Sequence, residues 1–167
     1  MNIFESFKKQ LNPVLYIQIW EKRIRAVDIL TGDTFDEKPI VALETNSKGL
    51  VTIKAVGYKA TVMSGNAISI INPFSHERTL LSDFTLAERL LRYIFQKLHK
   101  GKLLRTSPTV VIHPMEKLEG GLTMIEDRAF RELALSAGAR ETVLYLGDQL
   151  PTHDFDLEKV KALDVKK

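Results

Sequence analysis

Apolar and polar side chains alternate over the first part of the chain in a pattern that predicts strands. Residues 14–20 and 23–29 are rich in β-branched and aromatic side chains, and the second run alternates cleanly. Only Glu21-Lys22 separates the two runs, so we expect an antiparallel hairpin. A turn at residues 31–33 follows, and residues 39–43 are the predicted third strand of an antiparallel meander.

Two later segments repeat apolar residues at the helical period. The first begins at Ser82 or Asp83, either of which can cap it, and ends near Lys100 and Gly101. The second covers residues 124–136 and stops at Gly138. Each helix is followed by an apolar run typical of a buried strand, at residues 109–112 and 142–146. Two β-prone pieces, residues 50–56 and 68–71, precede the first helix.

This order of elements predicts an α/β fold. We expect a mixed sheet made of a three-stranded antiparallel meander plus a βαβ unit, with flanking helices. At 167 residues the chain is long enough for one substantial domain. The expected divisions are an amphipathic N-terminal segment (1–13), the domain itself (14–150) and a charged C-terminal tail (151–167) that frays or forms a short helix.

Composition narrows the classes of function. The formal net charge is only +3, and cysteine is absent, which excludes disulfides and thiolate metal sites. No apolar stretch approaches the ~20 residues of a membrane-spanning helix, and no signal-peptide pattern is present, so a cytoplasmic location is expected. The four histidines lack metal-ligand spacing, so no metal site is predicted. His113, at the end of a buried strand, is interpreted as a structural histidine.

Several short motifs carry a resemblance to a known family. In chain order they are Ile-Asn-Pro at 71–73, Ser-Asp-Phe at 82–84, Ser-Pro at 107–108 with Val-Val-Ile-His-Pro at 110–114, Glu-Asp-Arg-Ala-Phe at 126–130 and Ala-Gly-Ala-Arg-Glu at 137–141. Their order and spacing are similar to the bacterial actin MreB family of rod-shape-determining proteins. The resemblance implies a ribonuclease-H-like, actin-like half-domain, equivalent to the N-terminal part of such a protein.

The resemblance also implies where nucleotide would bind, and the residues there do not match. The family's first phosphate loop has an Asp-x-Gly-Thr pattern at the tip of the first hairpin. This chain places Gln18 at the aspartate, Trp20 at the glycine and Glu21 at the threonine. Glutamine supplies no charge for a Mg²⁺ shell, tryptophan fills the phosphate space and glutamate repels it. Asp148 would reach the family's catalytic position only if the alignment shifted, and the other half of the nucleotide cleft lies beyond this chain. We therefore expect no catalytic residue, no bound nucleotide and no cofactor.

Two surfaces are candidate contacts. Ile3, Phe4, Phe7 and Leu11 line one side of a short N-terminal helix. Some family members begin with a membrane-binding helix of this kind, so it either contacts the inner face of the cell membrane peripherally or packs on the domain. Arg89, Arg92, Lys97 and Lys100 make the first long helix basic, which favours an acidic protein partner or a solvated face over nucleic acid, because stacking aromatics are scarce.

Three functional hypotheses remain at this point. The first is a non-catalytic MreB-like protein that acts by protein contact in cell-shape or cytoskeletal organisation, with an actin-like or cell-morphogenesis partner. The second is an ATPase component completed in trans by another chain. The third is a small-molecule binder that reuses the fold.

Overall fold

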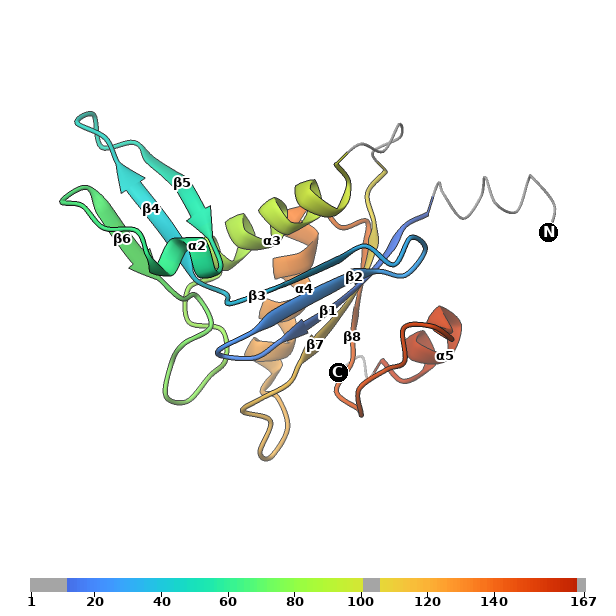
Figure 1. Cartoon of the computed structure of the whole chain (residues 1–167). Helices are drawn as coiled ribbons and strands as arrows, with labels where there is room; N and C mark the ends of the chain where they lie inside the picture. The colour runs from blue at the N-terminus through green and yellow to red at the C-terminus, as the bar shows by residue number, and fades with distance from the viewer. Residues whose placement is uncertain (1–11, 101–105, 165–167) are drawn as a thin grey trace.

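The computed structural model describes residues 12–100 and 106–164, and its strands form two separate sheets (Figure 1). The larger sheet has five strands in the order β3-β2-β1-β7-β8, and the smaller has three in the order β5-β4-β6. Their bounds are β1 Val14–Ile19, β2 Ile24–Asp28, β3 Thr34–Glu37, β4 Val41–Thr45, β5 Val51–Val56, β6 Ile68–Ile71, β7 Thr109–Pro114 and β8 Glu141–Leu144.

The larger sheet is mixed, as predicted. Strands β1, β2 and β3 form an antiparallel meander, while β7 and β8 run parallel to β1. The predicted third strand was wrong, however. The segment after the turn, Thr34–Glu37, completes the meander, and the apolar run at 41–43 is instead part of β4. The strand β4 lies at the centre of the smaller antiparallel sheet, between β5 and β6, and a central position explains its apolar composition.

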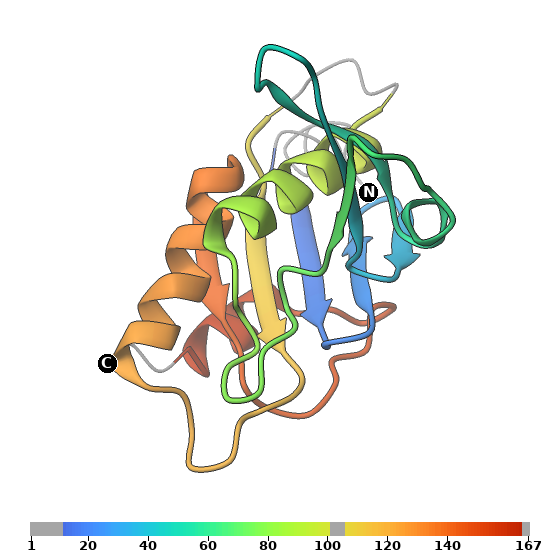
Figure 2. The same cartoon turned by 90° about the vertical axis from the view of Figure 1, so that its left-hand side faces the viewer.

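Two long helices cover one face of the larger sheet (Figure 2). Asp83 caps α3 (Phe84–Leu98) by accepting a hydrogen bond from the Leu86 amide. Of the two predicted cap residues, Ser82 and Asp83, the second is therefore the one used. Thr123 and Glu126 form a reciprocal capping box at the start of α4 (Met124–Ala137), and Gly138 ends that helix in the left-handed conformation. A short helix, α2 (Tyr58–Thr61), follows β5.

The main core lies between the larger sheet and these two helices. Alternate residues of β1, namely Leu15, Ile17 and Ile19, are fully buried there against α3 and α4. The opposite face of the sheet holds a smaller cluster that includes Tyr16, Val111 and Val143. The C-terminal helix α5 (Leu157–Ala162) covers this second cluster through Val160, so the tail does form a short helix and it packs on the domain.

Residues 1–11 of the predicted N-terminal segment lie outside the described residues, and with them the predicted contact residues Ile3, Phe4, Phe7 and Leu11. Within the part of the chain that the structure describes, no helix is both long enough and apolar enough to cross a membrane.

Candidate functional site

The candidate site lies at the carboxyl ends of β1 and β7. These strands are parallel and neighbouring, with Ile19 opposite Pro114, so the hairpin tip after β1 and the loop after β7 emerge at the same edge of the sheet. In α/β proteins, ligands bind beyond the carboxyl ends of the strands. The loop after β6 reaches the same place. We call the side chains that meet here the strand-end cluster: Trp20, Glu21, Arg23, Asn72, Ser75, Glu116 and Lys117.

Glu21 is the centre of the strand-end cluster, because every polar group it carries is engaged. Its backbone N–H donates to a carboxylate oxygen of Glu116 at 2.6 Å, and its carbonyl accepts from the Asn72 amide at 2.7 Å. Its own carboxylate accepts from the Ser75 hydroxyl at 3.2 Å and lies 3.0 Å from the Lys117 ammonium. The hydrogen bond from Lys117 and its charge lower the pKa of Glu21, so the carboxylate is charged at neutral pH.

Lys117 joins two loops to the hairpin tip. Besides its ion pair with Glu21, its ammonium donates to the carbonyl of His76 in the loop after β6. Lys117 is also the non-glycine residue that the described chain holds at a positive φ, 59°, a left-handed conformation that costs energy for a side chain of this type. The contacts of the ammonium group offset this cost and keep the loop after β7 against the hairpin.

Trp20 is half-buried at the hairpin tip. The Arg23 guanidinium carbon lies 5.2 Å from the centre of the Trp20 ring, a cation–π distance. The same guanidinium makes a two-point contact with the Asp36 carboxylate at 2.7 and 2.6 Å. This contact raises the pKa of Arg23 and lowers that of Asp36. Strand β3, which carries Asp36, therefore supports the arrangement around Trp20.

Gln18 is fully buried in β1, two residues before Trp20 at the tip. Its side-chain oxygen accepts from Arg25 at 3.1 Å, and its amide nitrogen lies 3.9 Å from the sulfur of Met115. Both ends of the amide thus have protein partners, which is what a buried polar side chain requires. Gln18 acts here as an internal bridge between β2, β1 and the loop after β7.

His113 lies next to Gln18 on β7 and is a satisfied structural histidine, as predicted. One ring nitrogen is 2.8 Å from the Tyr16 hydroxyl and the other is 3.0 Å from the Gly147 carbonyl. The Leu150 amide in turn donates to the Tyr16 hydroxyl at 3.2 Å. Burial lowers the pKa of His113 to about 4, so the ring is neutral at pH 7. The chain of hydrogen bonds fixes the segment after β8 to the sheet.

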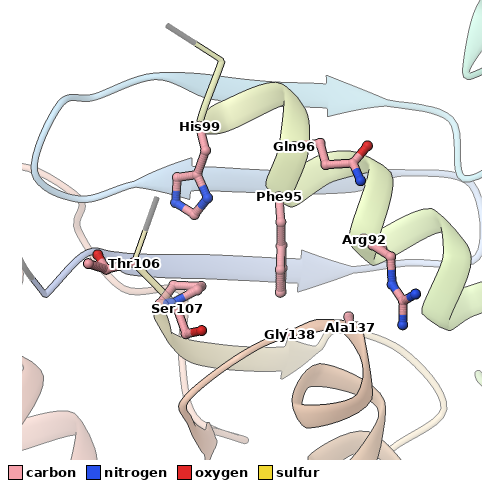
Figure 3. Close-up of a pocket in the computed structure, with 9 residues that line it drawn as sticks. Arg92, Phe95, Gln96, His99, Thr106, Ser107, Ala137 and Gly138 are labelled. Carbon is pink, nitrogen blue, oxygen red and sulfur yellow. The ribbon is translucent and has the colours of Figure 1, made fainter. Parts of the chain in front are cut away.

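The basic residues of α3 are partly used inside the molecule. Arg89 donates to the Val51 carbonyl at 3.1 Å, and Arg92 donates to the Ser136 carbonyl at 2.9 Å while pairing with Glu88. Lys97 lies over the Tyr93 ring at 5.4 Å, and Lys100 is exposed. Arg92 also lines a small hollow of about 180 Å³ between the ends of α3 and α4 (Figure 3). The hollow lies at the opposite ends of the strands from the strand-end cluster, because Ser107 and Pro108 precede β7.

The polar groups of the strand-end cluster are bonded to other groups of the same protein. A phosphate loop leaves backbone N–H groups free for an anion. At this hairpin tip, the N–H of Glu21 already has an anionic acceptor in Glu116, and the cations Lys117 and Arg23 are already paired with carboxylates. The three positions singled out in the sequence, Gln18, Trp20 and Glu21, lie together because they are nearly contiguous. The contacts of Glu21 with Asn72, Ser75, Glu116 and Lys117 gave no signal in the sequence, since these residues are 51 to 96 positions away and come together only through the fold; Asn72 had been noted only as part of a family motif.

The fold is that of an actin-like half-domain. Two solved structures match it in fold: MreB5 of Spiroplasma citri bound to ADP, with a TM-score of 0.62 at 19% identity over 82% of this chain and 39% of that one, and the MamK double helical filament, with a TM-score of 0.61 at 15% identity over 81% and 41%.

Sequence comparison then gives the family. The family model described as MreB/Mbl protein matches residues 28–149, and the chain therefore belongs to the MreB/Mbl family of cytoskeletal proteins. The cell shape-determining protein MreB of Haemophilus influenzae is 35% identical over 117 residues, and that of Escherichia coli K12 is 32% identical. Each alignment covers 68% of this chain and 32% of the relative, so the chain spans about a third of the length of the curated relatives it matches.

Proposed function

We propose that this chain is a non-catalytic MreB-like protein that acts by protein contact in cell-shape organisation. The observation that carries the proposal is the hydrogen bond from the Glu21 backbone N–H to the Glu116 carboxylate at 2.6 Å. The Glu116 carboxylate accepts from a backbone N–H of the kind that a nucleotide phosphate would need as a donor. The remaining polar groups of Glu21 are held by Asn72, Ser75 and Lys117, so the hairpin tip is closed by the protein itself.

Electrostatics supports the same proposal. Two carboxylates, Glu21 and Glu116, stand at the tip, and the lowered pKa of Glu21 keeps it charged at neutral pH. A nucleotide would bring several more negative charges to this point, and like charges at short range repel. The match to the family model starts at Asp28, after the hairpin tip, which agrees with the divergence of Gln18, Trp20 and Glu21 from the pattern implied by the family resemblance.

Binding of Mg-ATP tests the proposal directly, because Trp20 is the one tryptophan of the chain and lies in the strand-end cluster. Titration of the full chain with Mg-ATP, followed by tryptophan fluorescence and by calorimetry, should give no saturable signal. The MreB of Haemophilus influenzae serves as the comparison protein under the same conditions. Saturable binding with a micromolar dissociation constant would overturn the non-catalytic assignment.

A matched variant removes optical artefacts from this test. Trp20→Phe deletes the reporter while keeping an aromatic ring over Arg23, so any fluorescence change that persists in it belongs to the nucleotide and not to the site. Calorimetry of both forms should agree. Heat of binding in the wild type that disappears in Trp20→Phe would show that a nucleotide does reach the hairpin tip.

We also propose a cytoplasmic protein that attaches peripherally to the membrane through residues 1–11, on the strength of the apolar positions Ile3, Phe4, Phe7 and Leu11. Liposome co-sedimentation of the full chain and of a chain lacking residues 1–10 measures this attachment. The full chain should sediment with anionic vesicles and the truncated chain should stay in the supernatant. Equal recovery of both would remove the membrane component of the proposal.

The protein partner is proposed to be an acidic surface of an actin-like or cell-morphogenesis protein that meets α3. Lys97 and Lys100 carry this proposal, because both are exposed, whereas Arg89 and Arg92 also donate to carbonyls of their own chain. A pull-down from native cytosol with the wild type and with Lys97→Glu/Lys100→Glu should recover such a partner with the wild type alone. Recovery of no actin-like or envelope-morphogenesis protein with either bait would contradict it.

A further inference from the structure

The edge strands of the two sheets differ in how they are protected. An open edge offers unpaired backbone groups to other strands, and natural sheets block it with charged side chains, proline or a covering segment. In the larger sheet, β3 carries Asp36 and Glu37, and Glu141 of β8 pairs with Lys161 of the C-terminal helix at 3.0 Å. In the smaller sheet, β5 carries Lys54. Among the described residues, β6 is the edge strand that has neither a charged side chain nor a proline.

The strand β6 is also exposed and apolar. Its four residues are Ile-Ser-Ile-Ile, and Ile70 and Ile71 keep 46% and 37% of their surface accessible. In Figure 1 the strand lies at the outer side of the smaller sheet, beside β4 and with no strand on its other side. Pro73 lies two residues after the strand and lacks an N–H, so it limits any pairing to residues 68–72.

The ladder with β4 decides which backbone groups face outward. The Thr45 N–H donates to the Ala67 carbonyl at 3.0 Å, and hydrogen-bonded pairs alternate along an antiparallel ladder. Ala67, Ser69 and Ile71 therefore direct their backbone groups to β4. Ile68 and Ile70 direct theirs away from it. The Ile68 N–H is satisfied by the Gly65 carbonyl at 3.0 Å, but no hydrogen bond within the described residues uses the outward N–H or carbonyl of Ile70.

We propose that β6 pairs with β6 of a second copy of this chain, antiparallel and about a two-fold axis at Ile70. In this register Ile70 faces Ile70 of the copy, and the two residues exchange both N–H···O=C bonds. Ile68 faces Asn72 on either side. The two smaller sheets join into one continuous antiparallel sheet, and the paired Ile70 side chains cover each other.

A second copy is the occupant that the edge geometry selects. The pairing surface is self-complementary, because the same groups of Ile70 donate and accept on both sides of the axis. No like charges meet, since residues 68–72 are uncharged. The other edges of the same protein are unsuitable partners, because β3, β5 and β8 would each bring an unpaired or competing charge to the ladder. The pairing is short, so the dimer is reversible and depends on concentration.

The test uses the full chain in a concentration series by sedimentation velocity. The wild type should shift from monomer to dimer as concentration rises. Ile70→Lys places two like charges across the axis and should weaken dimerisation by about tenfold or more. Val62→Lys is the matched control: Val62 is 67% exposed and follows α2, which packs on the smaller sheet, but it lies outside the edge strand, so this variant should dimerise as the wild type does. Circular dichroism checks that both variants fold.

The two-fold axis gives a second and sharper readout. Because residue 70 faces itself, Ile70→Lys mixed with Ile70→Glu should form a heterodimer, while each variant alone stays largely monomeric. The chain has no native cysteine, so Ile70→Cys should also form a disulfide-linked dimer on mild oxidation, whereas Lys54→Cys on β5 should not. A wild type that is monomeric throughout, or a dimer that Ile70→Lys leaves intact and the mixed charges do not restore, would overturn the proposal.

This inference rests on the proposed function in that it names a contact for a protein that acts by contact. The two fail separately, however. Saturable Mg-ATP binding would overturn the non-catalytic assignment while leaving the Ile70 pairing measurable. A monomer that binds no nucleotide would overturn the pairing and leave the non-catalytic assignment standing.

Discussion

The two sheets of this protein use their polar groups in opposite ways. In the larger sheet the strand ends and edges are engaged: every polar group of Glu21 has a partner, His113 joins β7 to the segment after β8, and both edge strands carry charged side chains. The smaller sheet leaves Ile70 exposed, with its backbone directed outward. The difference places the internally bonded groups in the larger sheet and leaves an uncharged, exposed edge in the smaller one, which is the edge that the proposed pairing uses.

The largest effect should come from the buried strand of the larger sheet. Ile17→Ala should lower the free energy of unfolding by about 2–5 kcal/mol, because Ile17 is fully buried between the sheet and its helices and a cavity would remain. Ile70→Ala, on the open edge, should change it by about 0.5 kcal/mol or less in dilute protein. Urea unfolding of both variants measures the difference. Similar losses in the two would contradict the division between the sheets.

Acid should weaken the larger sheet through His113. Its pKa is about 4 in the folded chain against an ordinary value of 6.5, so the unfolded chain takes up the proton first as pH falls. The stabilisation is present above pH 6.5 and is lost towards pH 4, by roughly 3 kcal/mol in total. Tyr16, whose hydroxyl contacts the ring, does not titrate in this window, since burial raises its pKa further, and Tyr145 contacts the ring through its aromatic edge.

Unfolding measured from pH 7 to pH 4.5 isolates this contribution, because the carboxylates with lowered pKa, such as Glu21 and Asp36, lose their contribution at lower pH. His113→Gln should flatten the profile in this window. His153→Gln, at an exposed position of the tail, should leave it unchanged. A wild-type profile that is already flat between pH 6.5 and 4.5 would show that His113 titrates normally.

Release of the C-terminal tail should have a smaller effect. Arg131 of α4 contacts Asp164, which follows α5, at 2.6 and 2.9 Å, and the Asp164 side chain is almost fully buried. Arg131→Gln should cost about 2 kcal/mol and increase proteolysis after α5, because it leaves the Asp164 carboxylate without this cation. Arg128→Gln, which removes an exposed pair with Glu132 on the same helix, is the control and should behave as wild type. Equal protease resistance in all three proteins would contradict a docked tail.

Burial determines the pattern in most of the elements that the sequence predicted, while the largely exposed strands β5 and β6 were predicted from their β-prone residues. The helices α3 and α4 and the strands β1, β2, β7 and β8 carry apolar positions because they pack on the core, and these elements were predicted correctly. The meander's third strand was assigned wrongly. Thr34–Glu37 is an exposed edge held by backbone pairing, so it has no apolar alternation to detect, and β4 is apolar because it is central in a sheet that was not foreseen.

The candidate site shows the same limit. The resemblance to the family identified Gln18, Trp20 and Glu21 as positions of interest, but their partners could not be inferred. Asn72 and Lys117 approach Glu21 because β6, β7 and the hairpin bring their loops to one edge of the molecule, and no local spacing records such an approach. Contacts between residues that are far apart in the sequence can be predicted only once the pairing of the strands is known.

The smallest effect should appear at Glu21, and it separates a closed hairpin tip from an open one. Glu21→Gln removes the ion pair with Lys117 but keeps the backbone hydrogen bond to Glu116. Since the group is close to solvent, global stability should change little, while amide exchange at Glu21 and Lys117 should accelerate by roughly two- to tenfold. Glu119→Gln, in the same loop and exposed, should leave exchange at both amides unchanged. Unchanged exchange in Glu21→Gln would mean that the backbone bond to Glu116 alone holds the tip closed. In that case Glu116→Gln, which weakens the acceptor of the Glu21 N–H, becomes the variant that should open the tip.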